Sequence, residues 1–193
     1  MNPVNANEQV RRLPENQEEK KCWFVMRDLK RPNALHPAYK QLAEARIEVF
    51  TPMKWLLKTK HGRRIREQVP VISDLLFVCE TRSVLDPIVD KIPTLQYRFR
   101  KGGAYREPMV VPDADMERFI RAIEASDDPK YFLPEELTPA MYGRFVHIVG
   151  GPLDGFDVRL LSVRGSKIKR VLVELPDFIS VGVEVNPDYV RLL

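Results

Sequence analysis

Short runs of apolar residues, each bounded by polar or turn-forming residues, divide the first 125 residues into strand-like and helix-like segments. Runs rich in aromatic and β-branched side chains predict strands at 22–26, 47–52, 75–79 and 94–100. Helical spacing predicts helices at 37–45, at 111–126 and, with an interruption near Pro87, at 83–92. This order predicts an α+β domain, in which an antiparallel sheet carries its helices mostly on one face.

The segment 111–126 has the clearest helical pattern in the chain. Asp113 follows Pro112 and is a natural N-cap, and the acidic residues of the first turn suit the positive end of the helix dipole. Four apolar residues follow the i, i+3, i+4, i+7 spacing of one helix face: Met116, Phe119, Ile120 and Ile123. We expect this stripe to face a core.

Residues 53–80 predict a long β-hairpin with a basic tip. An extended segment at 53–59 leads into "KTKHGRRIRE" (58–67), which gathers five Lys and Arg residues around His61 and Gly62. The chain then returns through 67–80, whose "LLFVC" core predicts a buried strand. A solvated loop is one interpretation of the basic tip, and a phosphate-binding patch is the other.

Periodic patterning stops near Ser126, and residues 126–142 predict an extended, proline-containing connection. Beyond it, alternating runs predict short strands at 144–149, 156–163, 168–175, 178–185 and the C-terminus. Five such strands predict a small closed barrel. The corner after the first of them contains four residues that supply the backbone angles and stiffness of a sharp turn: Gly150, Gly151, Pro152 and Gly155.

The chain is therefore expected to contain a polar, disordered leader (1–20), an α+β domain (21–125), a connection (126–142) and an all-β domain (143–193). The leader lacks the apolar region of a secretory signal, and no apolar run of about 18 residues occurs, so we expect a cytoplasmic protein with no membrane partner. Cys22 and Cys79 lie beside or inside apolar runs, without metal or redox spacing, and are interpreted as reduced, buried thiols.

The positive charge of the chain indicates nucleic acid as a candidate partner. The net charge is +4, and basic residues cluster at 26–31, 58–67 and 97–101. This bias is compatible with nucleic acid, on whose unpaired bases exposed aromatic side chains can also stack. The candidates for stacking are Trp55, Tyr39 and Tyr105.

Enzymatic motifs are missing from the sequence. The three histidines, His36, His61 and His147, have no metal-ligand spacing. Ser73 and Asp74 lie outside any G-x-S-x-G frame, and "KGGAY" lacks the Gly-Lys pair of a phosphate-binding loop. We therefore expect no catalytic residue, no cofactor and no metal site.

Several phrases resemble NusG-like transcription factors. The stretch "VHIVGGPLDGFDVRLLSV" is similar to the KOW motif, a strand–Gly-Pro loop–strand unit of an SH3-like barrel. Upstream, "WFVMRDLKRP", "YKQLAEARIEVFTP" and "VPVISDLLFV" resemble the NusG N-terminal domain, in the family's order. The phrases "LQYRFRKGGAY" and "GPLDG" narrow the resemblance to UpxY-type antiterminators of capsular polysaccharide operons in Bacteroides-like bacteria.

The resemblance implies a non-enzymatic function at the elongating RNA polymerase. The N-terminal domain would bind the clamp helices of the polymerase through an apolar pocket and suppress pausing and termination, with Leu75, Phe77, Phe50 and Pro52 as pocket residues. Residues that would contact non-template DNA or nascent RNA are Arg27, Lys30, Arg31, His36, Lys40, Arg98 and Arg100. The KOW domain would bind a ribosomal protein, the termination factor Rho or RNA.

Two residues depart from the family pattern. Leu75 replaces an aromatic residue of the expected pocket, so apolar burial is kept and ring packing is lost. Val158 stands where the KOW motif has its second glycine, and a β-branched residue favours ordinary extended angles over a bulge at that position. These departures favour a specialised paralogue and leave the partner of the KOW domain open.

Two alternatives remain at this stage. One, within the same class, is a housekeeping NusG. The other is an RNA- or ribosome-associated KOW protein that acts in translation or in transcription–translation coupling. The apolar "LLFV" strand and the hairpin favour the transcription factor, because a purely ribosomal KOW protein has no use for the N-terminal domain.

Overall fold

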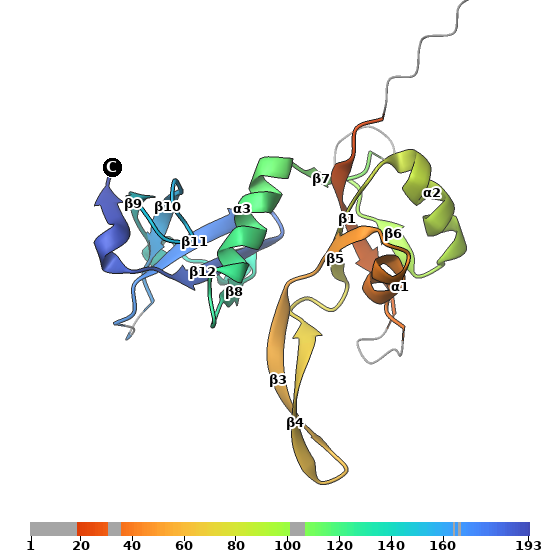
Figure 1. Cartoon of the computed structure of the whole chain (residues 1–193), viewed down its shortest axis with the longest axis horizontal. Coiled ribbons are helices and arrows are strands. Elements are labelled where there is room, and N and C mark those ends of the chain that lie inside the picture. The colour runs from red at the N-terminus through yellow and green to blue at the C-terminus, as the bar shows by residue number, and fades with distance from the viewer. Residues whose placement is uncertain (1–18, 31–35, 101–106, 164, 166) are drawn as a thin grey trace, which may run out of the picture.

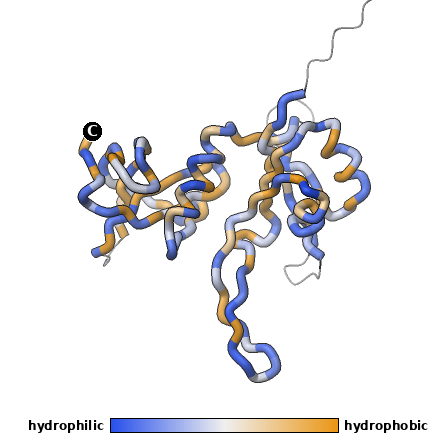
Figure 2. Tube along the Cα trace, viewed as in Figure 1, coloured by the Kyte–Doolittle hydropathy of each residue, from blue (hydrophilic) through white to orange (hydrophobic). Residues whose placement is uncertain are grey.

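The computed structural model describes residues 19–30, 36–100, 107–163, 165 and 167–193. Almost all of the expected leader, together with Arg31 and Tyr105, lies outside these residues. The described chain forms two β-sheets, with a projecting hairpin and a helix between the sheets (Figure 1). In Figure 2, apolar residues gather along the strands of the two sheets, which is where the core lies.

The first sheet is antiparallel and is built around β1 (Cys22–Asp28). Its strand order is β2-β5-β1-β6, and β7 also pairs with β1. The other strands are β2 (Glu48–Phe50), β5 (Leu75–Glu80), β6 (Leu95–Tyr97) and β7 (Val110–Val111). The strand predictions are therefore confirmed, with β6 and β2 shorter than expected.

One face of this sheet is covered by two helices, α1 (Ala38–Glu44) and α2 (Arg82–Lys91). Leu42 of α1 and Leu85 of α2 pack with Phe24, Met26 and Val78 in one buried cluster. The predicted interruption at Pro87 is wrong, because α2 is continuous through that residue. Packing of the helix on the sheet compensates for the backbone hydrogen bond that proline cannot donate.

The third helix, α3 (Asp113–Glu124), lies on the opposite side of the first sheet, between it and the second sheet (Figure 1). Met116 and Phe119 of the predicted stripe are buried, while Ile120 and Ile123 are half-buried. Ala122, which was not part of that stripe, is buried as well. The helix lies against β11 and β12 of the second sheet as well as β1 of the first. The apolar side of α3 therefore packs against both sheets.

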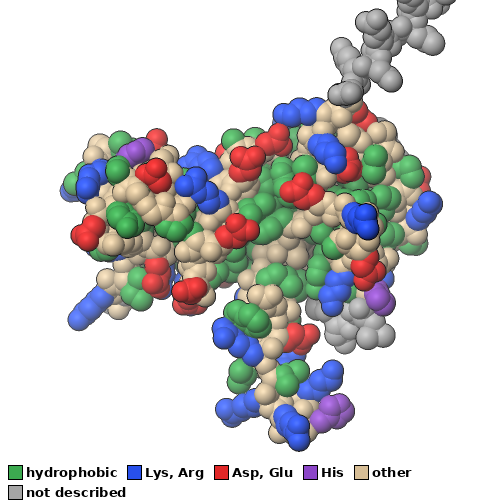
Figure 3. Space-filling model, in the orientation of Figure 1, with side chains coloured by type: hydrophobic (Ala, Val, Ile, Leu, Met, Phe, Trp, Pro, Cys, Tyr) green, Lys and Arg blue, Asp and Glu red, His purple; other side chains and the backbone are tan. Residues whose placement is uncertain are grey.

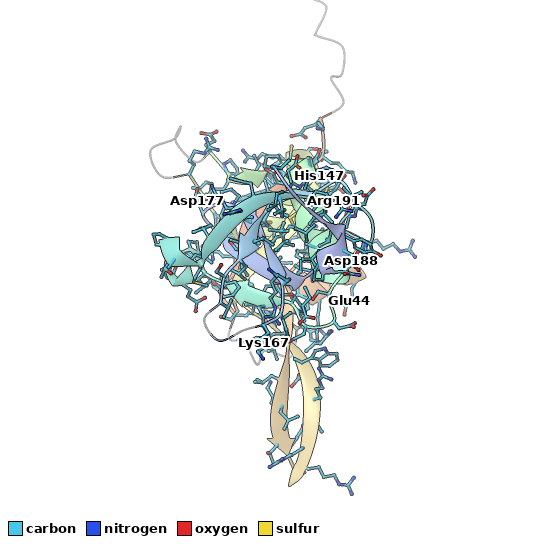
Figure 4. All side chains as sticks on the ribbon, turned by 90° about the vertical axis from the view of Figure 1, so that its left-hand side faces the viewer. Glu44, His147, Lys167, Asp177, Asp188 and Arg191 are labelled. Atoms are coloured by element: carbon cyan, nitrogen blue, oxygen red, sulfur yellow. The ribbon has the colours of Figure 1, made fainter. Side chains whose placement is uncertain are left out.

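A separate two-stranded hairpin consists of β3 (Met53–Lys60) and β4 (Arg63–Pro70). Both residues of its turn have positive φ, 50° at His61 and 73° at Gly62, which is the geometry of a type I′ turn. Figure 1 and the side view of Figure 4 both show the hairpin projecting away from the two sheets. The predicted hairpin with a basic tip is thus confirmed for residues 53–70. Its predicted extension to residue 80 is wrong, because β5 pairs with β1 and β2 of the first sheet instead.

The second sheet has six strands in the order β13-β9-β10-β11-β12-β8. These strands are β8 (Lys130–Phe132), β9 (Tyr142–Ile148), β10 (Asp157–Leu161), β11 (Arg170–Leu175), β12 (Ile179–Glu184) and β13 (Val190–Leu192). Short 3₁₀ turns lie at Pro134–Glu136, Pro139–Met141 and Pro187–Tyr189. Valines of β9, β11 and β12 fill its core.

The predicted closure of this barrel is not found, because the end strands β13 and β8 do not pair with each other in the described part of the chain. β8 itself lies within the segment predicted as a connection. Val158 pairs regularly with Val146, as its β-branched side chain predicts, and the irregularity in register falls just beyond it, between Arg159 and Leu161. Within the described residues, no helix is both long and apolar enough to cross a membrane.

Candidate functional site

The predicted pocket residues Leu75 and Phe77 lie on the face of the first sheet that α1 and α2 leave uncovered. Strand register explains this, because Phe77 is opposite Val25 of β1 and Phe50 of β2, and directly opposed residues share a face. Leu75 and Phe77 point away from the helices, whereas Leu76 and Val78 point toward them. The sheet therefore has a second apolar face, here called the Phe77 face, formed by Trp23, Val25, Phe50, Leu75 and Phe77.

The Phe77 face is covered by the chain itself. Leu75 is 3% exposed and Phe77 is fully buried. The ring of Phe178, in the turn between β11 and β12, meets Phe77 edge-on with the centroids 6.1 Å apart. Phe119 of α3 meets Phe50 edge-on at 6.4 Å. The predicted pocket is thus an apolar surface that α3 and the second sheet occupy in this conformation.

Two arginines of α3 connect the helix to the second sheet. Nε of Arg121 donates to the carbonyl of Pro152 at 2.6 Å, and a terminal nitrogen of Arg118 donates to the carbonyl of Asp157 at 3.0 Å. Both guanidinium groups also lie over the ring of Phe156, at 5.0 and 5.2 Å from its centroid. The sequence offered only a charged helix face as a signal, and these contacts were not predicted.

The Gly-Pro loop has the backbone angles that its glycines predict. Gly150, Gly151 and Gly155 have φ values of 97°, 71° and 81°. The ring of Tyr189 packs over the loop, because a Cβ atom built on Gly151 would lie 2.8 Å from that ring. With Arg121 on the carbonyl of Pro152, both α3 and the C-terminal segment contact this loop. These contacts cover part of the loop backbone.

Three of the predicted nucleic-acid-binding residues, Arg27, Arg98 and Arg100, line one groove of about 1100 Å³ beside Phe178. Arg27 and Arg98 also share a partner, because their terminal nitrogens lie 3.5 and 3.2 Å from Oδ2 of Asp74. That carboxylate neutralises part of their positive charge. The site is therefore less cationic than a count of its arginines suggests.

The other predicted cationic residues lie where β1 leads into α1. The ammonium of Lys30 donates to the carbonyl of His36 at 2.7 Å, while His36 and Lys40 are exposed. The buried carboxylate of Asp28 accepts hydrogen bonds from the backbone N–H groups of Lys30 and Ala38, and so fixes this segment. Asp28 was not singled out from the sequence, which gives no sign that its carboxylate is buried.

Cys79 lies on the same side of the sheet as the Phe77 face, and Cys22 and Cys79 are both free. The prediction that both thiols are buried is wrong, because each residue is only half-buried. Burial, assisted by the nearby carboxylate of Glu48, raises the pKa of the Cys79 thiol to about 11. A metal-binding group of three or more His, Cys, Asp or Glu residues is not found among the described residues. The geometry thus favours a structural thiol.

We expect iodoacetamide to alkylate Cys79 about 100-fold more slowly at pH 8 than a thiol of pKa near 9, because only the thiolate reacts. The rate should rise about tenfold per pH unit up to pH 10, since deprotonation is favoured as pH approaches the raised pKa. Mass spectrometry of timed samples measures the rate, with urea-unfolded protein as the control. Equal rates for folded and unfolded protein would contradict this assignment.

No protein-family model matches the chain, and no curated protein matches it. Among solved structures, it is similar to NusG of Thermotoga maritima, from a structure described as "Domain interaction in Thermotoga maritima NusG". That similarity has a TM-score of 0.42 and 15% sequence identity, and it covers 90% of this chain and 98% of the other.

Proposed function

We propose that the chain is a NusG-like transcription factor that binds elongating RNA polymerase through the Phe77 face and suppresses pausing or termination. The observation that carries the proposal is the ring cluster on that face. Phe50 and Phe77 form an apolar surface whose cover, Phe178, comes from the other sheet. A groove that accepts apolar anchors is the usual docking site for a helical partner.

Binding through this face requires a change of conformation. The polymerase would have to displace Phe178 and α3, because together they bury Leu75 and Phe77. The apparent affinity is then the intrinsic affinity reduced by the fraction of molecules that are open. Substitutions that weaken the cover without altering the Phe77 face should therefore strengthen binding.

The nucleic-acid partner of this function is non-template DNA or nascent RNA. Arg27, Arg98 and Arg100 share a groove beside the face, so a strand held there would lie next to the docked polymerase. Lys30, His36 and Lys40 form a second cationic segment at the start of α1, together with Arg31 of the sequence. The narrower role, antitermination in a capsular polysaccharide operon, rests on the resemblance to UpxY-type proteins, and the second sheet would bind Rho, a ribosomal protein or RNA.

The substitution Phe178→Glu tests the proposal. It removes the ring that covers Phe77 and places a carboxylate beside an apolar face, which disfavours the closed conformation. We expect the apparent affinity for core RNA polymerase to rise about tenfold, which corresponds to about 1.4 kcal/mol. Anisotropy of the labelled protein, titrated with purified polymerase, measures the change.

The matched control is Asp177→Asn, in the same turn. Asp177 is exposed and has a φ of 68°, a conformation that asparagine tolerates, so its replacement should leave the affinity unchanged. If neither the parent chain nor Phe178→Glu binds polymerase, the proposed function is wrong. Co-sedimentation with ribosomal subunits instead would favour the translation alternative.

A further inference from the structure

The β3–β4 hairpin contains apolar residues that packing within the protein does not explain. All residues from Lys54 to Gln68 are exposed, and none of them belongs to either core cluster. Four large apolar side chains are nevertheless retained on it: Trp55, Leu56, Leu57 and Ile65. Exposed apolar residues grouped in this way mark a surface that contacts another molecule.

The hairpin also accounts for the positive charge of the whole chain. It contains six of the 31 Lys and Arg residues and one of the 27 Asp and Glu residues, so it carries a net charge of +5 and the rest of the chain carries −1. The single acidic residue, Glu67, pairs with Lys58 at 2.9 Å. In Figure 3, the basic side chains gather along the hairpin and around its tip. A partner of strongly negative charge fits this distribution.

Strand register separates the hairpin into two faces. Trp55 is opposite Gln68 and Leu57 is opposite Arg66, so Trp55, Leu57, Arg64 and Arg66 share one face. The guanidinium of Arg66 lies 4.5 Å from the centroid of the Trp55 ring, which is still 52% exposed. The part of the indole ring that Arg66 leaves exposed can stack on a base. Arg64, which is opposite Thr59 on the same face, lies nearer the tip and can contact a phosphate.

The opposite face repeats the mixture of cations and apolar side chains. Lys58 is opposite Ile65 and Lys60 is opposite Arg63, and Leu56 is opposite Glu67. Because each face carries both kinds of residue, the hairpin has no single apolar face to insert into a bilayer. An exposed aromatic ring also gains little from a duplex, because the bases of a duplex are already stacked on one another and cannot stack on the ring.

We infer that the β3–β4 hairpin is a binding site for single-stranded nucleic acid, with a base stacked on Trp55 and phosphates held by the cations toward the tip. The base of the hairpin faces a groove lined on its far side by Asp127 and Asp128. Lys130 of the same groove pairs with Asp128 at 2.7 Å, so the groove itself is close to neutral. The phosphates are placed nearer the tip, at Lys60, Arg63 and Arg64, where residues 59–66 include no acidic residue. This site is separate from the groove of Arg27, Arg98 and Arg100, and it does not depend on polymerase.

Tryptophan fluorescence tests the site directly, because Trp23 is 6% exposed and Trp55 is the other tryptophan of the chain. Titration with a 20-nucleotide oligo-dT at low salt should quench the emission, and Trp55→Phe should abolish the quenching while the Trp23 signal remains. In anisotropy measurements with labelled oligo-dT, Trp55→Ala should weaken binding about tenfold, within the range for loss of one stacked base. Unchanged Trp23 emission shows that each variant is folded.

The pair Arg64→Glu and Arg66→Glu tests the phosphate contacts. These substitutions should weaken binding and make the slope of log affinity against log salt shallower by about 1.4, because each contact to a single strand contributes about 0.7. The matched control is Lys167→Glu with Lys169→Glu, which changes the net charge equally in the connection that leads into β11; Figure 4 labels Lys167. The control should leave the salt slope unchanged.

Three results would overturn the inference. One is oligo-dT binding that neither Trp55→Ala nor the double arginine variant weakens. Another is tighter binding of a 20-base-pair duplex than of oligo-dT at the same salt. The third is quenching of Trp55 by anionic phosphatidylglycerol vesicles or by an acidic polypeptide, without quenching by oligo-dT. None of these results depends on polymerase, so they are separate from the outcome of the Phe178→Glu experiment.

Discussion

Replacing Phe77 with alanine should lower the free energy of unfolding by about 3–5 kcal/mol, the range for removing a fully buried phenyl ring. Phe77 has no exposed surface, and its ring lies between Phe50, at 6.5 Å, and Phe178, at 6.1 Å. Its loss leaves a cavity at the junction of the first sheet and the turn that covers it. The substitution therefore reports on the packing of the Phe77 face.

Urea unfolding, followed through the fluorescence of Trp23 in a Trp55→Phe background, measures this change. Leu57→Ala is the control, because Leu57 is 62% exposed on the hairpin and should have an effect within about 0.5 kcal/mol. Phe77→Leu should lose less than Phe77→Ala, since it leaves a smaller cavity. A loss below about 1 kcal/mol for Phe77→Ala would show that the ring is not enclosed in solution.

Substituting Gly151 with alanine should destabilise the second sheet by about 2–3 kcal/mol. Two costs combine at this position. The φ of 71° is a conformation that residues with a side chain rarely adopt, which costs about 1 kcal/mol or more. The new methyl group would also lie 2.8 Å from the ring of Tyr189, which must move away from the loop.

Gly155→Ala separates the two costs. Gly155 has a similar φ of 81°, but a Cβ atom there would meet nothing within 4 Å, so this variant should lose only about 1 kcal/mol. Calorimetric unfolding of both variants measures the difference. Equal losses would mean that Tyr189 does not pack on the loop.

Local patterning predicted the elements of the fold well. The apolar run "LLFVC" predicted the buried strand β5, and the helical spacing of Met116 and Phe119 predicted the buried side of α3. These features follow from backbone geometry, which repeats within a few residues. The strand β8 was missed because three residues of an edge strand have too short a pattern to recognise.

The candidate site was less predictable, because its arrangement depends on contacts that are distant in sequence. Periodicity showed that Phe77 needs an apolar neighbour, but could not show that the neighbour is Phe178, from the second sheet. Similarly, nothing near Arg121 in the sequence indicates that its guanidinium donates to the carbonyl of Pro152. The pairing of Arg27 and Arg98 with the carboxylate of Asp74 could not be predicted for the same reason.

The cover over Phe77 belongs to the same polypeptide as the surface it hides. Its closure is a first-order event, so the proportion of closed molecules does not change when the protein is diluted or concentrated. A low concentration of the protein in the cell would not expose the Phe77 face, and a high concentration would not cover it further. A competitor for the phenyl rings, or a ligand that draws the second sheet away, would alter that balance without any change of sequence.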